Sequence, residues 1–206
     1  MVPVFALALV AAAAQSSAKP GCASIPYPDV SQECSRRQAE ADTLCKRDAW
    51  ECVGLDTKPL RSDVAALSGK LEGVKTEQDE MRRQEPEAGD DKSENLQLKI
   101  GDLEGVIVQS SVDLLAAEQT LEARLAQIDL RITNGRQCRD ALIAVRDAFK
   151  AATRQARFDP EAASKPANGP LIEQWAKARE EKDKAIEKVV GGLDQCEKQR
   201  AGEAGD

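Results

Sequence analysis

The chain has 206 residues, contains no histidine and carries a formal net charge of −7 at pH 7. Its aromatic content is 3% and its charged content 32%, which is typical of long amphipathic helices rather than of a sheet core. Without histidine, the commonest general base and the His-assisted serine and cysteine nucleophiles are excluded. We therefore expect an all-α protein, and we expect it not to be an enzyme.

Residues 1–18 have the features of a secretory signal peptide. They contain no Asp, Glu, Lys or Arg, and an apolar run over residues 2–14 is followed by small residues. Such a run is too short to span a bilayer, which needs about 20 apolar residues. We predict cleavage at or near Ala18, a secreted or periplasmic location, and no stable membrane insertion of the mature protein. The alternative is an apolar N-terminal helix of a cytosolic protein, because the segment lacks a basic residue.

Residues 19–58 form a cysteine-rich segment with one expected helix. Prolines at positions 26 and 28 favour an extended start. Asp29 or Ser31 can cap a helix that runs to about Cys52, and Gly54 with Pro59 can end it.

The six cysteines form an even set, which in an exported protein favours disulfides. No pair has C-x-x-C spacing, so a zinc site is disfavoured and we expect no metal or other cofactor. On a continuous helix, Cys34, Cys45 and Cys52 would lie roughly 16 and 10 Å apart along the axis, too far to bond one another. Each would then need an outside partner. The outside partners in that case are Cys22, Cys138 and Cys196. The alternative, which we favour, is that this helix breaks and that Cys138 bonds to Cys196. These are the two cysteines at which the heptad rows of apolar residues on the last two predicted helices meet.

Residues 59–134 predict a long antiparallel helical hairpin. Apolar residues recur every 3.5 positions on both sides of a charged loop at 85–92, as two facing helices require. The pairing sets Met81 against Leu96 and Val64 against Leu114, and Asn134-Gly135 is expected to cap the end of the return helix. The first seam comprises Leu60, Val64, Leu67, Leu71, Val74, Gln78 and Met81, and the return seam Leu96, Ile100, Leu103, Ile107, Ser110, Leu114 and Ala117.

Residues 135–196 predict a second hairpin that turns at residues 166–170. Trp175 lies next to this turn and is expected to cap the end of the hairpin core, and residues 197–206 are expected to be a disordered tail. The fold class is therefore two antiparallel coiled-coil-like helical hairpins in an elongated bundle, preceded by the cysteine-rich helical segment. The forward seam of this hairpin is Cys138, Leu142, Val145, Phe149, Ala152 and Ala156, and the returning seam is Ala178, Lys182, Ala185, Val189, Gly192 and Cys196.

Two helices carry a second apolar stripe, which a simple two-helix contact would leave in water. Either the hairpins pack on each other or the molecule self-associates, because contiguous exposed apolar stripes mark partner surfaces; we favour internal packing. Gly101 and Gly105 have GxxxG spacing, which outside a membrane we interpret as a close helix contact. The return helix of the first hairpin presents Leu98, Gly105, Val108, Val112 and Leu115, and the last helix presents Ile172, Ile186, Val190 and Leu193.

A basic stripe is the one candidate site for anionic partners. Residues 59–134 have a net charge of −7 and residues 135–206 a net charge of +1. A basic stripe can bind nucleic acid, anionic lipid or an acidic protein. We favour a solvated face, or one that complements the acidic hairpin, because an acidic chain repels polyanions and no aromatic residues interleave the stripe. Its members are Arg139, Arg146, Lys150, Arg154 and Arg157.

These features favour an exported, disulfide-braced interaction or scaffold protein whose partner is another protein or itself, and not nucleic acid. A periplasmic holdase-type chaperone or assembly factor that grips unfolded clients is the alternative. A carboxylate enzyme is disfavoured because no apolar pocket is predicted that would raise the pKa of a carboxyl group.

Overall fold

The structure, a computed structural model, describes residues 21–46, 49–87, 89–159 and 168–203. Within these ranges the chain is helical and forms no strand, which confirms the predicted fold class. The signal-peptide prediction falls on residues 1–18, outside the described ranges. The helices are α1 (Pro28–Leu44), α2 (Lys58–Gln84), α3 (Asp90–Phe158) and α5 (Asn168–Ala201), with two 3-10 turns, η1 (Cys22–Ser24) and η2 (Glu85–Glu87).

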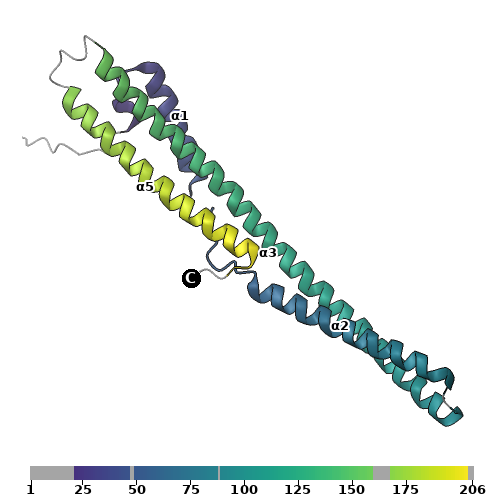
Figure 1. The fold of residues 1–206 in the computed structure, drawn as a ribbon. Helices are drawn as coiled ribbons and strands as arrows, with labels where there is room; N and C mark the ends of the chain where they lie inside the picture. The colour runs from purple at the N-terminus through teal and green to yellow at the C-terminus, as the bar shows by residue number, and fades with distance from the viewer. Residues whose placement is uncertain (1–20, 47–48, 88, 160–167, 204–206) are drawn as a thin grey trace, which may run out of the picture.

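One helix, α3, forms the long axis of the molecule. Its 69 residues correspond to a rod of about 100 Å. Figure 1 shows α5 lying along the C-terminal part of this rod and α2 along its N-terminal part, both running opposite to α3. The two hairpins therefore share a single helix, and α2 begins where α5 ends. At that junction the Thr57 hydroxyl donates to the Gln199 carbonyl, and Arg61 donates to the Arg200 carbonyl at 2.6 Å.

The expected helix end at Asn134-Gly135 is wrong, because α3 passes through both residues. Asn134 donates its side-chain amide to the Ala49 carbonyl at 2.9 Å, and Gly135 is buried. A glycine can serve as a left-handed cap or as a small residue at a close contact. Gly135 has the second role, whereas Gly202, directly after α5, has a φ of 80°.

The C-terminal tail is also more ordered than expected. α5 continues to Ala201, so the prediction of a disordered tail from residue 197 is wrong for the part that the structure describes. Glu197 accepts from Arg136 at 3.2 Å, and Arg200 pairs with Asp129 at 2.6 Å. The polar composition that suggested disorder reflects ion pairs with α3. Residues 204–206 lie outside the described ranges.

The cysteine-rich segment contains a shorter helix than expected. α1 starts at Pro28, which suits the first helical position, rather than after a cap at Asp29 or Ser31. The Ser31 hydroxyl instead donates to the Cys22 carbonyl at 3.0 Å. The expected end near Cys52 is wrong, because α1 stops at Leu44 and the described residues after it are not helical until α2.

Three disulfides join cysteines 34, 45 and 52 to the three outside cysteines. The bonds are Cys22–Cys34, Cys45–Cys138 and Cys52–Cys196. The favoured Cys138–Cys196 bridge is therefore wrong, and the alternative pairing pattern is present even though α1 does end before Cys45.

The two helices of the second hairpin, α3 and α5, are shifted along their axes relative to the alignment that a Cys138–Cys196 bridge requires. An added Cβ on Gly135 would meet the Leu193 side chain, and Arg146 lies 3.5 Å from Asp183. These contacts place Cys138 five to six residues, or roughly 8 Å along the axis, away from the level of Cys196, beyond disulfide reach. The heptad spacing gave the direction of the helices correctly but not their relative slide.

Peptide mapping without reduction should recover these three crosslinks. The Cys52–Cys196 bond, with a sequence separation of 144 residues, should raise the free energy of unfolding by about 5 kcal/mol. The Cys22–Cys34 bond, with a separation of 12, should raise it by about 3 kcal/mol, because a shorter closed loop restricts the unfolded chain less. We expect urea unfolding to show a larger loss for Cys52→Ala/Cys196→Ala than for Cys22→Ala/Cys34→Ala. A recovered Cys138–Cys196 peptide would contradict the arrangement.

Candidate interaction surface

The molecule divides into a thick part and a thin part. We call the described N-terminal residues 21–46 and 49–57, together with α5 and residues 128–158 of α3, the base, and α2 with residues 90–121 of α3 the arm. Buried hydrophobic residues concentrate in the base, whereas the arm contributes Leu71 to the buried hydrophobic set. Figure 1 shows the arm continuing past the end of α5 as a pair of helices.

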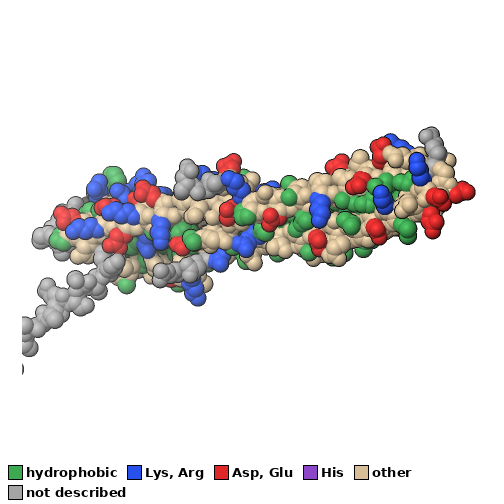
Figure 2. All heavy atoms as spheres, turned by 90° about the horizontal axis from the view of Figure 1, so that it is seen from below, with side chains coloured by type: hydrophobic (Ala, Val, Ile, Leu, Met, Phe, Trp, Pro, Cys, Tyr) green, Lys and Arg blue, Asp and Glu red, His purple; other side chains and the backbone are tan. Residues whose placement is uncertain are grey.

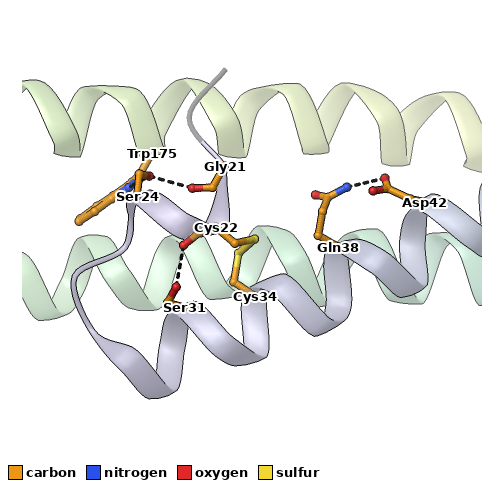
Figure 3. The surroundings of a disulfide bond; sticks show 8 residues. All are labelled: Gly21, Cys22, Ser24, Ser31, Cys34, Gln38, Asp42 and Trp175. Carbon is orange, nitrogen blue, oxygen red and sulfur yellow. Dashed lines mark hydrogen bonds between the residues drawn. A yellow bond between two sulfur atoms is a disulfide. The ribbon is translucent and has the colours of Figure 1, made fainter. Parts of the chain in front are cut away.

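The core of the base contains the predicted seam of α3. Every forward seam residue from Cys138 to Ala156 is buried. Trp175 is only 1% exposed, and its indole nitrogen donates to the Ser24 hydroxyl oxygen at 3.1 Å. As Figure 3 shows, the Cys22–Cys34 disulfide fastens η1 to α1 beside this contact. The η1 turn thus covers the end of the α3–α5 hairpin near Trp175.

Trp50 locks the base near the point where the arm begins. Its indole ring lies against the backbone of Gly192 in α5, where an added Cβ would clash with the ring, and its Cβ lies close to Gly135 in α3. The ammonium of Lys188 lies 5.6 Å from the ring centroid, within the range of a cation–π interaction. Two glycines on facing helices therefore form a notch for a tryptophan of a third segment.

Adjacent glycines in α5 provide a matched test of this notch. We expect Gly192→Ala to lower the free energy of unfolding by about 1–3 kcal/mol, because the new methyl group overpacks against Trp50. Gly191 has nothing within 4 Å of an added Cβ, so Gly191→Ala should be neutral or stabilise by up to about 1 kcal/mol through helix propensity. Equal effects in chemical denaturation would contradict the close contact.

The arm has the predicted seam between α2 and α3. Each seam residue from Leu60 to Met81 and from Leu96 to Ala117 is buried or half-buried. Gln78 donates to the Ile100 carbonyl at 3.3 Å, at the level that the predicted pairs require. Arg82 crosses to Glu104 at 2.8 Å. The arm is therefore a single layer of two helices held by one narrow contact.

The side of α3 that faces away from this seam is apolar and open. Leu98 and Val108 are each 65% exposed, Val112 56% and Leu115 55%. Gly101 and Gly105 lie in the same row and are also exposed. We call these six residues the outer stripe. Figure 2 shows hydrophobic side chains on the arm surface, with acidic side chains gathered at its tip.

The two second stripes have different outcomes. In α5, Leu193 is buried, and Ile172 and Ile186 pack against the core, leaving Val190 exposed. Internal packing was therefore the correct expectation for α5 and the wrong one for the outer stripe. The interpretation of GxxxG as a close helix contact is also wrong within the described residues, because nothing lies within 4 Å of an added Cβ on either glycine.

The basic stripe lies on the far half of α3, and two of its members are paired with neighbouring carboxylates. Arg139 contacts Asp140 at 2.9 Å. Arg146 contacts Asp147 at 2.9 Å and Asp183 at 3.5 Å, and the hydrogen bond to Asp147 raises the pKa of its guanidinium. The other members, Lys150, Arg154 and Arg157, are exposed. Among the described residues, no ion pair is found for these three cations, which lie on the last turns of α3.

We expect charge reversal of Arg146, Lys150 and Arg154 to leave binding to nucleic acid and to anionic vesicles unchanged at near-physiological salt. The net charge of −7 opposes polyanion binding, and the best-placed arginine already has two carboxylate partners. Salt-sensitive binding by the original chain that the triple variant loses would contradict this interpretation.

A shallow depression of about 730 Å³ lies at the junction of α2, α3 and α5. Its lining contains two ion pairs, Arg136 with Glu197 and Arg200 with Asp129. Arg61 donates to the Arg200 carbonyl. Each of these cations has a partner, so the depression is a polar joint between the helices. Sequence reasoning missed it because its members come from three distant segments.

No group of three or more Cys, Asp or Glu side chains in the described ranges is arranged to hold a metal ion. Within the same ranges, none of the helices has the length and apolar character needed to cross a bilayer. The chain matches no protein-family model, no curated protein and no solved structure.

Proposed function

We propose that the protein is an exported, disulfide-braced helical scaffold that binds proteins through the arm and has no catalytic activity. The observation that carries this proposal is the outer stripe, an apolar surface on a helix pair that extends from a braced base. Exposed contiguous apolar surface of this kind marks a contact with another molecule.

The bracing supports both the scaffold role and export. The six cysteines form three disulfides, and such bonds persist in oxidising compartments outside the cytosol. Two of them attach the segment around Trp50 to α3 and to α5. The base therefore offers a fixed mount, and α2, with 27 residues, gives the arm a length of about 40 Å.

Two surface glutamates with a lowered carboxyl pKa are consistent with a non-enzymatic role. Arg36 and Arg37 donate hydrogen bonds to Glu33 and lower the pKa of its carboxyl to about 2. Lys184 donates to Glu180 and also lowers the pKa of that carboxyl. A general acid at neutral pH needs the opposite shift, which burial in an apolar pocket produces. These residues instead form surface ion pairs along α1 and α5.

A holdase-type chaperone or assembly factor is the second candidate, and the same outer stripe favours it. Four large apolar side chains on an extended arm could contact unfolded clients without much sequence preference. The two roles differ in selectivity, because a scaffold binds one folded partner in a defined register and a holdase binds many unrelated chains.

Crosslinking in the cells that make the protein, followed by affinity capture and mass spectrometry of the exported fraction, tests the proposal. We expect a small, reproducible partner set, and Val108→Glu/Val112→Glu should lower its recovery at least about tenfold, a loss of about 1.4 kcal/mol of binding free energy. Leu130→Glu is the matched control, since Leu130 is 60% exposed on the same helix but lies outside the outer stripe. Equal losses in both variants would contradict a role for the stripe.

Aggregation assays separate the two candidates. A scaffold should not protect several unrelated denatured proteins, whereas a holdase should suppress the aggregation of all of them. Capture of many unrelated exported proteins, together with such suppression, would replace the scaffold proposal by the chaperone.

A further inference from the structure

We propose that the outer stripe binds the outer stripe of a second copy of this chain, antiparallel and about a two-fold axis. This inference names the partner for the binding role proposed above and rests on that role. It follows from the order of large and small residues along the stripe, from the charges beside it and from the side of α3 on which it lies.

The stripe is complementary to its own reverse. Its residues follow alternating steps of three and four, the spacing of a helix–helix seam. A two-fold axis midway between Val106 and Ile107 sets Leu98 opposite Leu115 of the second copy. It also sets Gly105 opposite Val108, and Gly101 opposite Val112. Each valine then faces a glycine, and the leucines close both ends of a contact about 27 Å long.

The glycines leave notches that the chain itself does not fill. An added Cβ on Gly101 or Gly105 would meet nothing within 4 Å, although glycine inside a helix costs about 1 kcal/mol relative to alanine. In the base the equivalent notch at Gly192 holds Trp50. In the proposed dimer, the valines of the second copy occupy the notches of the arm in the same way.

Charged residues beside the stripe select this register. In an antiparallel pair, residues on one flank of the stripe face residues on the same flank of the second copy. Asp102 then lies nearest Gln109 of the second copy, and Glu104 lies nearest Ser111. A slip of one heptad toward the tip of the arm would bring each Asp102 and each Glu104 against its own counterpart. A slip the other way would set Glu104 against Glu118. Like charges across a helix interface are unfavourable, so the self-complementary register is also the one that avoids repulsion.

The outer stripe is sterically open to a second α3. At 100° per residue it lies on the side of α3 roughly opposite the seam with α2, so two arms can meet through α3 without displacing either α2. The same side of α3 is covered in the base: Asn134, about ten turns beyond Leu98, donates to the Ala49 carbonyl. Within the described residues this cover does not extend to the arm.

Glycine-to-leucine variants in the full exported chain test the proposal by sedimentation equilibrium. We expect the original chain to dimerise, and Gly101→Leu/Gly105→Leu to raise the dimer Kd at least about tenfold while leaving the arm helical, because the leucines fill the notches. Gly69→Leu/Gly73→Leu is the matched control on the exposed face of α2, where an added Cβ also meets nothing within 4 Å. It should leave the Kd unchanged.

The orientation has its own test. Leu98→Lys should weaken the dimer, and adding Leu115→Glu to the same chain should restore it, because antiparallel pairing places the two new charges opposite each other. A parallel pair would set like charges together and be weakened by both changes.

Two outcomes would overturn the inference. Loss of the dimer in the Gly69→Leu/Gly73→Leu control would assign the contact to α2. A chain that stays monomeric at high micromolar concentration would remove the self-pairing altogether. In that case a different protein captured through the outer stripe would leave the scaffold role standing, so failure of the dimer and failure of the scaffold proposal are distinguishable.

Discussion

The insertion of Trp50 between α3 and α5 is the contact on which the rest of the structure depends. Only 3% of the residues are aromatic, and most of the helices bury only one narrow row of apolar side chains. Trp50 fills the notch at Gly135 and Gly192, and disulfides from Cys45 and Cys52 hold its segment to both helices. Three segments distant in sequence are thereby joined at the junction from which the arm extends.

This construction makes the two ends of the molecule unequal. The base combines a buried core with three disulfides, whereas the arm has one seam in which most residues are only half-buried. Local stability follows buried apolar contact, so the arm should open before the base. Burial of the outer stripe against another molecule would stabilise the arm by mass action. Binding at the outer stripe would therefore be coupled to the stability of the arm.

The sequence predicted features that depend on local periodicity. Heptad spacing identified the seam from Leu60 to Met81 and the seam from Cys138 to Ala156, because side chains three and four residues apart share a helix face. The spacing could not predict the slide between α3 and α5, since a seam made mostly of small and aliphatic residues can pack at several relative positions along the helix axis. The disulfide pairing depends on that slide, and for this reason Cys138–Cys196 was the wrong bridge.

The sequence predicted only part of the candidate interaction surface, for a related reason. Periodicity revealed apolar second stripes on α3 and α5 but not which of them the N-terminal segment and the rest of the base would cover. That outcome depends on where α1 ends, and the helix stops at Leu44 instead of near Cys52. The sequence alone also left open which structural role each helical glycine has.

A glycine in a helical pattern indicates either a helix end or a close neighbour, and the sequence alone does not distinguish the two. Gly135 suggested a helix end and is instead a contact for Trp50 and Leu193. Gly105 suggested a close contact within the chain, yet its neighbourhood is open. The glycines of the base and those of the outer stripe differ in what surrounds them. Where the base keeps a helical glycine at a notch, a large side chain fills it, and the arm keeps two such glycines with nothing from the described chain to fill them. The cost in helix propensity is then offset only when a side chain from outside enters, and the valines that alternate with these glycines have the spacing to do so.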